Sequence, residues 1–290
     1  MDIKGKVLVG VAGWSYEDWK DVVYPAQEKN KLAHMTRLLD CIEINTSFYR
    51  PLSAWMAEKW LRDVSANEGF RFTAKLWSRF THESEGPYPD AGEVAAVREG
   101  FRPLREAGKL VAVLVQFPFF FRDGPESRER LERIAGDFAD YPKVVEVRDN
   151  SWAAPEALEF LGRLGLNVAC LDMPWTRQSF RADAVVSGTI GYLRAHGRNY
   201  DAWFSKNAGR DEKYDYLYSD KELDSIVERV ERLRQAAELV VLIWNNHFQG
   251  KAVANALQSV NRLLGTKVDV PPPMLESYPE LKQIARGQDG

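Results

Sequence analysis

The sequence is poor in the groups that several common chemistries require. It has two cysteines and four histidines in 290 residues. Cys41 and Cys170 both lie in apolar runs, so they predict no disulfide framework and are compatible with a reducing cytoplasm. No CxxC or HxxxH metal spacing is present, and neither is a glycine-rich phosphate fingerprint or a GxSxG elbow. Nucleophilic catalysis by serine or cysteine therefore has little support.

Long apolar runs and a strong excess of one charge are also missing. The longest uncharged apolar run, Leu110–Phe121, falls short of the ~20 residues that span a bilayer, and Gln116 and Pro118 interrupt it. The first apolar run, Val7–Trp14, is too short for a secretory signal. A net charge of -3 gives no reason to expect a general nucleic-acid-binding surface. We expect a soluble cytoplasmic protein with no membrane partner.

What the sequence does contain is a series of eight short apolar runs rich in β-branched residues. They are Val7–Gly13, Cys41–Phe48, Phe70–Leu76, Val111–Pro118, Val144–Asp149, Asn167–Pro174, Ile190–Gly197 and Glu238–Asn246. Runs that are apolar throughout are typical of parallel strands covered on both faces, and most segments between them are long enough for a helix. Eight such units predict an α/β fold, a single (β/α)8 TIM-type barrel. We assign residues 1–266 to the barrel and 267–290 to a C-terminal extension.

Helical patterning supports this alternation. It is clearest in Ala91–Ala107, Ser127–Ala139, Asp220–Ala237 and Gly250–Leu264. Ser53 and Asp220 are predicted N-caps of the helical segments that follow them. The connection Arg198–Ser219, after the seventh strand, is long and rich in aromatic residues, which predicts a functional loop.

Polar side chains mark the ends of nearly every predicted strand, where the active sites of such barrels lie. They are Glu43, Asn45, Lys75, Gln116, Glu146, Arg148, Asp172, Arg194, His196 and Asn245. Residues two apart on a strand share a face, so three pairs among them point the same way. Charged side chains are costly to bury unless they are paired or functional. The sequence therefore predicts a polar pocket that binds a small anionic molecule.

The residue types suggest roles within that pocket. Arg148 and Arg194 are predicted to hold a phosphate or carboxylate, because arginine binds such groups in bidentate fashion. Lys75, Asn45, Gln116 and Asn245 would complete substrate binding. Glu146 or His196 would transfer protons, with Asp172 and Glu43 orienting them. The reaction stays open between isomerisation, lyase chemistry and hydrolysis.

Two alternatives use the same residues. In the first, Glu146–Arg148 and Glu43–Lys75 are internal ion pairs that merely fill the barrel. In the second, a divalent metal is bound, because Glu43, Glu146, Asp172 and His196 would form an oxygen-rich site of the Mg or Mn type. The neighbouring arginines and lysine argue against the metal, since they would neutralise its carboxylate ligands.

Aromatic residues also cluster near the strand ends. They are Trp14, Tyr16, Trp19, Phe48, Tyr49, Trp152, Trp175 and Trp244. Packing beneath loops is the simpler interpretation. The alternative is a rim that stacks on a sugar or a base, with Trp14 and Tyr49 as substrate-binding residues.

A series of different short motifs extends, in order, from residue 10 to about residue 264. They are Gly13-Trp14-Ser15-Tyr16 with Trp19 and Tyr24-Pro25, the run from Ile42 to Arg50, Phe72-Thr73-Ala74-Lys75 with Thr81-His82, Gln116-Phe117-Pro118, Glu146-Val147-Arg148 with Ser151-Trp152, Asp172-Met173-Pro174, the run from Tyr192 to Gly197, and Trp244-Asn245-Asn246 with Gly250, Ala252, Asn255 and Ala256. On these motifs the chain resembles domain-of-unknown-function family 72, the YecE-like proteins. The resemblance implies a (β/α)8 barrel and no established reaction.

The chain departs from the family pattern at two positions. Asp21 stands where the family usually has glycine, and Asp149 stands where it commonly has histidine after Glu-Val-Arg. The second departure removes an acid–base or metal-binding group from the predicted pocket.

The family's barrel has been likened to endonuclease IV and xylose isomerase-type barrels, a fold analogy that does not determine function. It leaves a metal-dependent phosphodiesterase acting on nucleic acid as an alternative to the anion-binding enzyme. Four histidines are few for such a site. A non-catalytic ligand- or nucleic-acid-binding module is the third alternative.

Overall fold

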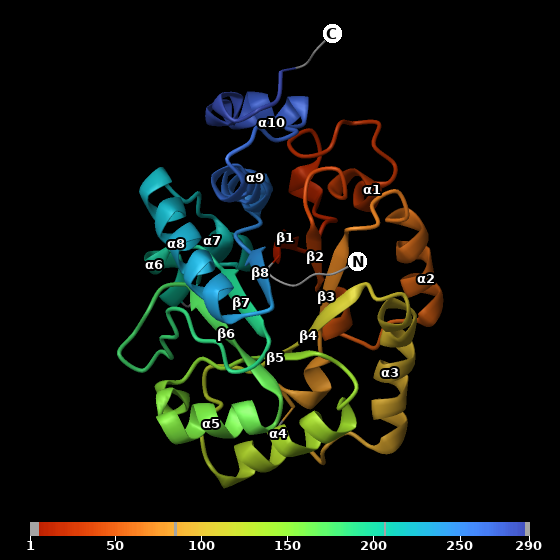
Figure 1. The fold of residues 1–290 in the computed structure, drawn as a ribbon, viewed down its shortest axis with the longest axis vertical. Coiled ribbons are helices and arrows are strands. Elements are labelled where there is room, and N and C mark those ends of the chain that lie inside the picture. Colours follow the sequence, from red (N-terminus) through yellow and green to blue (C-terminus); the bar gives the residue numbers. More distant parts are fainter. Residues whose placement is uncertain (1–5, 84–85, 206, 288–290) are drawn as a thin grey trace.

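The eight predicted strands form a closed parallel barrel in the order β1 to β8 (Figure 1). The structure, a computed structural model, describes residues 6–83, 86–205 and 207–287. The strands are β1 (Lys6–Ala12), β2 (Cys41–Ile44), β3 (Arg71–Lys75), β4 (Leu110–Gln116), β5 (Lys143–Glu146), β6 (Leu166–Asp172), β7 (Ile190–Ala195) and β8 (Leu239–Trp244). The predicted (β/α)8 TIM-type barrel is confirmed.

Helices surround the barrel (Figure 1). They are α1 (Lys31–Met35), α2 (Ala54–Asp63), α3 (Ala91–Glu106), α4 (Pro125–Asp137), α5 (Pro155–Arg163), α6 (Tyr200–Phe204), α7 (Arg210–Tyr214), α8 (Asp220–Ala236), α9 (Lys251–Leu264) and α10 (Pro272–Ser277). Short 3-10 turns are η1 (Glu17–Trp19), η2 (Thr46–Phe48), η3 (Ser78–Phe80), η4 (Asn150–Ala153), η5 (Phe248–Gly250) and η6 (Pro279–Gln283). The connection between β6 and β7, residues 173–189, is irregular and contains no helix. No described helix combines the length and apolar character needed to cross a membrane.

The helix starts test the two predicted N-caps. Ser53 caps α2, because its hydroxyl accepts a hydrogen bond from the Met56 amide at 3.2 Å. The prediction for Asp220 is wrong by one residue. Ser219 is the N-cap of α8, and the Glu222 carboxylate accepts a hydrogen bond from the Ser219 amide at 2.9 Å. The Ser-x-x-Glu spacing forms a reciprocal capping box, which moves Asp220 into the first turn.

The barrel interior changes from apolar to polar along its axis. Leu8, Leu114, Val144, Val241 and Ile243 belong to one buried cluster inside the barrel. The opposite strand faces pack against the surrounding helices in a second, larger cluster. Beyond the apolar layers, the inward positions nearer the carboxyl ends of the strands are polar or charged. The apolar core thus confines the polar groups to the end where barrel sites form.

The C-terminal segment packs onto the main core beyond α9 (Figure 1). Met274 in α10 and Leu281 in η6 are fully buried and belong to the larger cluster. Val268 and Ala285 form an isolated parallel bridge. The segment therefore folds back on the protein and contributes to its core, while a domain boundary at residue 266 stays a prediction.

Asp21 adopts a left-handed backbone conformation with φ of 59°. This conformation disfavours residues with a Cβ atom and suits glycine, which is the residue that the family resemblance places there. We expect Asp21→Gly to raise the free energy of unfolding by up to about 1 kcal/mol, because relief of backbone strain outweighs the added chain entropy. Urea unfolding at pH 7 would measure the effect, and a variant less stable than the parent would contradict it.

Candidate functional site

Strand alternation decides which of the predicted site residues enter the barrel. Glu43 lies two residues after Cys41, and Arg194 lies two after Tyr192, and both of these predecessors belong to the interior cluster. Asp172 has the opposite orientation. It shares a strand face with Cys170, which packs in the outer cluster.

Arg194 is the centre of a buried ion network. Its side chain is fully buried and donates from Nη2 and Nε to the two Glu43 carboxylate oxygens, at 2.6 and 3.1 Å. Nη1 donates to Glu146 Oε2 and also lies 3.4 Å from Gln116 Oε1. Tyr192 donates its hydroxyl proton to Glu43 Oε2 at 2.9 Å. Arg194 is thus held by protein carboxylates, which makes it a positioning residue of the network.

Glu146 joins this network to Arg148. Its Oε1 accepts hydrogen bonds from Arg148 Nη2 and Nε at 2.6 and 3.0 Å. Burial would raise the pKa of Glu146, but the guanidinium groups of Arg194 and Arg148 outweigh it and hold the pKa well below its usual value. The predicted Glu146–Arg148 ion pair is confirmed. The predicted Glu43–Lys75 pair is wrong, because Arg194 of β7 reaches across the barrel and binds both oxygens of Glu43.

Lys75 ends β3 beside this network and has no carboxylate partner. Within the described part of the chain its Nζ has no hydrogen bond or ion pair, and it lies 5.4 Å from the centroid of the Phe48 ring. Burial, and next the charge of Arg194, lower its pKa from 10.5 to about 8, although Glu43 and Glu146 act in the opposite direction. Lys75 is therefore a poorly compensated cation that loses its proton readily.

Two histidines near the strand ends, His196 and His82, are neutral at pH 7. Burial and then the Arg194 charge hold the pKa of His196 well below its usual value. Its Nδ1 lies 2.9 Å from Asn245 Nδ2. Burial, with Arg148 and Lys75, lowers the pKa of His82 to about 4. Neither imidazole adds to the positive charge of the site.

A cavity of about 280 Å³ opens at the carboxyl ends of the strands. Its lining comes from the loops after β1, β2 and β8, the end of β3, and α7. The lining residues are Gly13, Trp14, Ser15, Tyr16, Asn45, Thr46, Phe48, Tyr49, Lys75, Tyr214, Asn245 and His247. We call this space the mouth cavity. Five predicted substrate-binding residues reach it: Trp14, Asn45, Tyr49, Lys75 and Asn245.

Other predicted residues lie outside the lining. Glu43, Glu146, Arg194 and His196 are at most 1% exposed and form the buried network described above. Gln116 and Arg148 are partly exposed but do not line the mouth cavity. Glu43, Glu146 and His196 would therefore influence catalysis only through this network.

Asp172 belongs to a separate cluster of polar groups. Its carboxylate accepts hydrogen bonds from Arg198 Nε and Nη2 at 2.8 Å each and from Tyr218 Oη at 2.8 Å. Arg229 of α8 adds a fourth donor atom, Nη1, at 3.0 Å. Arg198 and Tyr218 stand at opposite ends of the predicted β7–α8 loop. Asp172 therefore fastens the loop that carries Tyr214 to the mouth cavity.

The four side chains considered as metal ligands do not fit a shared ion. Asp172 faces the outer layer, whereas Glu43 and Glu146 are bound by arginines inside the barrel. In residues 6–83, 86–205 and 207–287, no group of three or more His, Cys, Asp and Glu side chains is placed to hold a metal ion. We derive no metal-dependent step from this donor set.

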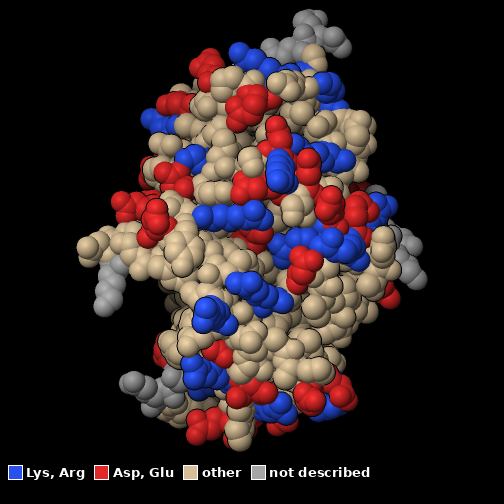
Figure 2. Space-filling model, turned by 90° about the vertical axis from the view of Figure 1, so that its left-hand side faces the viewer, with Lys and Arg blue, Asp and Glu red and all other residues tan. Residues whose placement is uncertain are grey.

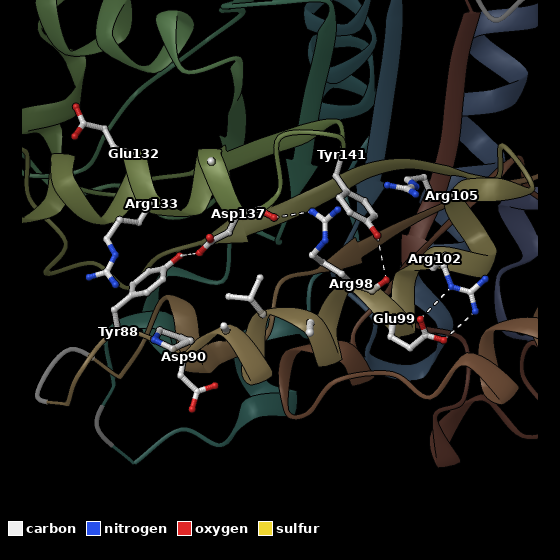
Figure 3. Close-up of a pocket in the computed structure, with 15 residues that line it drawn as sticks. Tyr88, Asp90, Arg98, Glu99, Arg102, Arg105, Glu132, Arg133, Asp137 and Tyr141 are labelled. Carbon is white, nitrogen blue, oxygen red and sulfur yellow. Dashed lines mark hydrogen bonds and ion pairs between the residues drawn. The ribbon is translucent and has the colours of Figure 1, made fainter.

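A larger groove, about 860 Å³, lies between α3 and α4 on the outside of the barrel (Figure 3). None of the predicted site residues lines it. Several of its polar groups already have protein partners, such as Arg102 with Glu99 at 2.9 Å and Tyr88 with Asp137 at 2.8 Å (Figure 3). Its size therefore does not outweigh the chemistry of the mouth cavity.

The sequence left two roles open for the aromatic residues, packing beneath loops and a rim at the strand ends, and different residues fit each role. Trp19, Trp152 and Trp244 are fully buried and pack in the core. Four of the expected residues, Trp14, Tyr16, Phe48 and Tyr49, line the mouth cavity. Other exposed aromatic side chains follow the ends of β2, β4 and β7, and they are Trp55, Phe119, Phe120, Tyr200 and Phe204. A rim that stacks on a sugar or a base stays a prediction.

Several residues of the site were not predicted from the sequence. Tyr192 could have been found by strand alternation, since it precedes Arg194 by two positions. The alternation of side chains along β6 also places Asp172 on the strand face that points away from the barrel interior. Tyr214 and Arg229 carried no such signal, because only the folding of the β7–α8 loop and α8 brings them to the strand ends.

Together, the fold and site define a (β/α)8 barrel protein with a polar site at the carboxyl ends of its strands. The chain belongs to the family described as "Protein of unknown function DUF72", which it matches over residues 8–278. It is 27% identical to the UPF0759 protein YunF of Bacillus subtilis, over 89% of this chain and 94% of that protein. Both comparisons confirm the resemblance seen in the sequence motifs.

Solved structures of DUF72 family proteins share the fold. A Thermotoga maritima protein is 31% identical with a TM-score of 0.79, and the match covers 89% of this chain and 99% of that chain. An Enterococcus faecalis protein is 27% identical with a TM-score of 0.80, over 92% of this chain and 98% of that chain. These relatives establish the family and the barrel, and their descriptions state no reaction.

Proposed function

We propose that the mouth cavity is the active site of an enzyme that binds a small phosphate- or carboxylate-bearing compound and acts by acid–base chemistry. The observation that carries the proposal is the charge balance around Lys75. Arg194 and Arg148 are matched by Glu43 and Glu146, and the imidazoles of His196 and His82 are neutral. Among these groups one positive charge remains, on Lys75, at the wall of the cavity. A partly buried, unmatched cation favours an anionic ligand.

The amide groups of the cavity would orient this ligand. Asn45 belongs to the lining, and its buried Oδ1 has no hydrogen-bond partner among the residues that the structure describes. A ligand hydroxyl or amine that donates to this oxygen would satisfy it. Trp14, Phe48 and Tyr49 offer apolar surface for the carbon skeleton. The site thus combines a cation, amides and aromatic rings around a space suited to a small molecule.

Lys75 is the group we assign to proton transfer at the ligand. With a pKa of about 8 it changes protonation state near neutral pH, which suits general acid–base catalysis. The neighbouring network of Arg194, Glu43 and Glu146 stays charged and sets the electrostatic field at Lys75. This assignment moves the anion-holding role predicted for Arg194 to Lys75, while Arg148, which pairs with Glu146 outside the lining, acts through the network.

Anion binding should be coupled to proton uptake. A bound anion favours charged Lys75 and raises its pKa, so binding at pH 8 should take up about half a proton. Calorimetric titration with inorganic phosphate, small carboxylates and sugar phosphates in buffers of different ionisation enthalpy measures this uptake. Lys75→Met should weaken binding by about 10- to 100-fold, on the order of the loss of one charged hydrogen bond.

The control is Lys109→Met. Lys109 Nζ donates to the carbonyl oxygens of Asn67 and Glu68 and does not line the mouth cavity, so this variant should bind as the parent does. Equal binding by the parent and Lys75→Met would contradict the proposal. Tight retention of zinc or manganese would instead favour the metal-dependent phosphodiesterase.

Oligonucleotide binding that weakens steeply with salt would favour the nucleic-acid-binding module. Acidic and basic side chains are intermixed on the face shown in Figure 2, which gives that alternative no support on this face.

A further inference from the structure

We infer that the Lys75 amine forms an imine with a carbonyl carbon of its ligand, a small hydroxylated aldehyde or ketone. This inference rests on the proposed function of the same cavity and specifies its substrate class. The geometry that points to it is an amine at a cavity wall, within a buried charged network, that makes no hydrogen bond to the described protein.

Two other lysines, the buried Lys143 and the half-buried Lys109, show how a structural amine is accommodated in this protein. Lys143 Nζ donates to the carbonyl oxygens of Phe138 and Tyr141 at 2.9 and 3.1 Å. Lys109 Nζ donates to Glu68 O at 2.8 Å and Asn67 O at 3.2 Å. Both lie at the amino ends of strands. Lys75, at the opposite end of the barrel, has no such acceptors, so a structural role does not explain its position.

The arginines explain why Lys75 lacks a partner beside two carboxylates. Arg194 binds both oxygens of Glu43, and Arg194 and Arg148 together bind both oxygens of Glu146. No carboxylate oxygen is left to form a close ion pair with the amine. Nucleophilic lysines are activated in this way, by desolvation and by a neighbouring cation.

The pKa supports the same conclusion. At a pKa of about 8, roughly a tenth of Lys75 is the neutral amine at pH 7, whereas an ordinary lysine is almost entirely protonated. The groups that influence it come from several strands and the β3–α3 connection. They are Arg194 on β7 and His196 just after it, Glu43 on β2, Glu146 and Arg148 at the end of β5, and His82 after β3.

The other cavity groups indicate the substrate class. Asn45 Oδ1 has no donor and fits a ligand hydroxyl. Aromatic side chains (Trp14, Phe48 and Tyr49) fit a short carbon chain, and a cavity of about 280 Å³ admits a small molecule. The positive charge at the mouth fits an acidic group on the same molecule. A hydroxylated aldehyde or ketone bearing phosphate or carboxylate meets all three requirements.

The covalent step is balanced without any further reactant. The Lys75 nitrogen lone pair attacks the carbonyl carbon, a C–N bond forms, and the C=O π pair becomes an alkoxide that takes a proton. The resulting carbinolamine loses water as the nitrogen lone pair forms the C=N bond. Ammonium and carbonyl thus give iminium and water, and the iminium withdraws electrons from the adjacent C–H or C–C bond.

Borohydride trapping tests the imine directly. The full chain is incubated with glyceraldehyde 3-phosphate or with hydroxypyruvate, reduced with borohydride, digested and analysed by mass spectrometry. We expect the secondary amine to form at Lys75 at least 10-fold faster than at Lys109 or Lys143. Lys75→Arg keeps the positive charge but cannot form the imine, so it should lose this adduct, whereas Lys109→Met should retain it.

Labelling of lysines in proportion to their exposure, with none preferred at Lys75, would overturn the imine. Phosphate binding by the parent protein is measured in parallel by thermal shift. Phosphate stabilisation without trapping at Lys75 would overturn the imine and leave the proposed anion site standing. Absence of both would overturn both.

Discussion

Replacing Arg194 by methionine is expected to lower the free energy of unfolding by about 3–5 kcal/mol, the usual cost of breaking a buried ion pair. Arg194 is fully buried between Glu43 and Glu146. Its loss leaves Glu43 without a cation and removes one of the two that hold Glu146. Urea unfolding at pH 7 measures the change, and Arg194→Lys, which keeps the charge, should lose less.

The loss of stability caused by Arg194→Met should also depend on pH. Glu146 has a native pKa below its unfolded value, so its stabilising contribution is present above about pH 4.5 and is lost as the pH falls through the native pKa. Without Arg194, Glu146 loses the largest influence that lowers its pKa and is protonated more readily, which reduces the penalty in acid. The stability difference between parent and variant should therefore narrow as the pH falls below about 4.5.

Arg102→Met is the matched control for this experiment. Arg102 pairs with Glu99 and Glu106 on an exposed helix surface, where solvent screens such pairs and they contribute little to stability. A similar small change for Arg194→Met would contradict the central role of that residue in the buried network.

Lys75→Met is expected to stabilise the protein, in contrast to Arg194→Met. It should raise the free energy of unfolding at pH 7 by up to roughly 3 kcal/mol. The native pKa of about 8 lies below the ordinary 10.5, so the folded state disfavours the charged amine. This penalty is present in full below pH 8 and disappears as the pH rises to 10.5. Urea unfolding at pH 7 and pH 10 should show the two proteins converging at the higher pH.

Lys143→Met provides the comparison with a structural lysine. Burial also lowers the pKa of Lys143, but its amine satisfies two backbone carbonyls that methionine would leave without a donor. We expect this variant to be less stable than Lys75→Met. A Lys75→Met protein less stable than the parent would show that the lysine stabilises the fold, which would weaken its assignment as the active group. A gain of stability with loss of ligand binding is typical of residues retained for function.

The sequence alone determined the barrel and the end at which its polar groups gather. Runs that are apolar throughout are typical of strands covered on both faces. Eight such runs, alternating with helical segments, indicated the closed parallel barrel that β1 to β8 form. The end of the site followed because Glu43, Lys75, Glu146 and Arg194 all stand near the carboxyl ends of their strands. Family membership was also apparent from the spacing of motifs.

Only the tertiary structure decided which charges meet. Arg194 and Glu43 are separated by 151 positions, and closure of the barrel brings them together, so Glu43 pairs with Arg194 instead of Lys75. The outward turn of Asp172 toward Arg198 and Arg229 likewise depends on how the β7–α8 loop and α8 pack. Ion pairing across a barrel is set by distance in space and by competition among partners, and a linear pattern carries neither quantity. That competition leaves Lys75 without a carboxylate at the mouth cavity, where its chemistry can be tested.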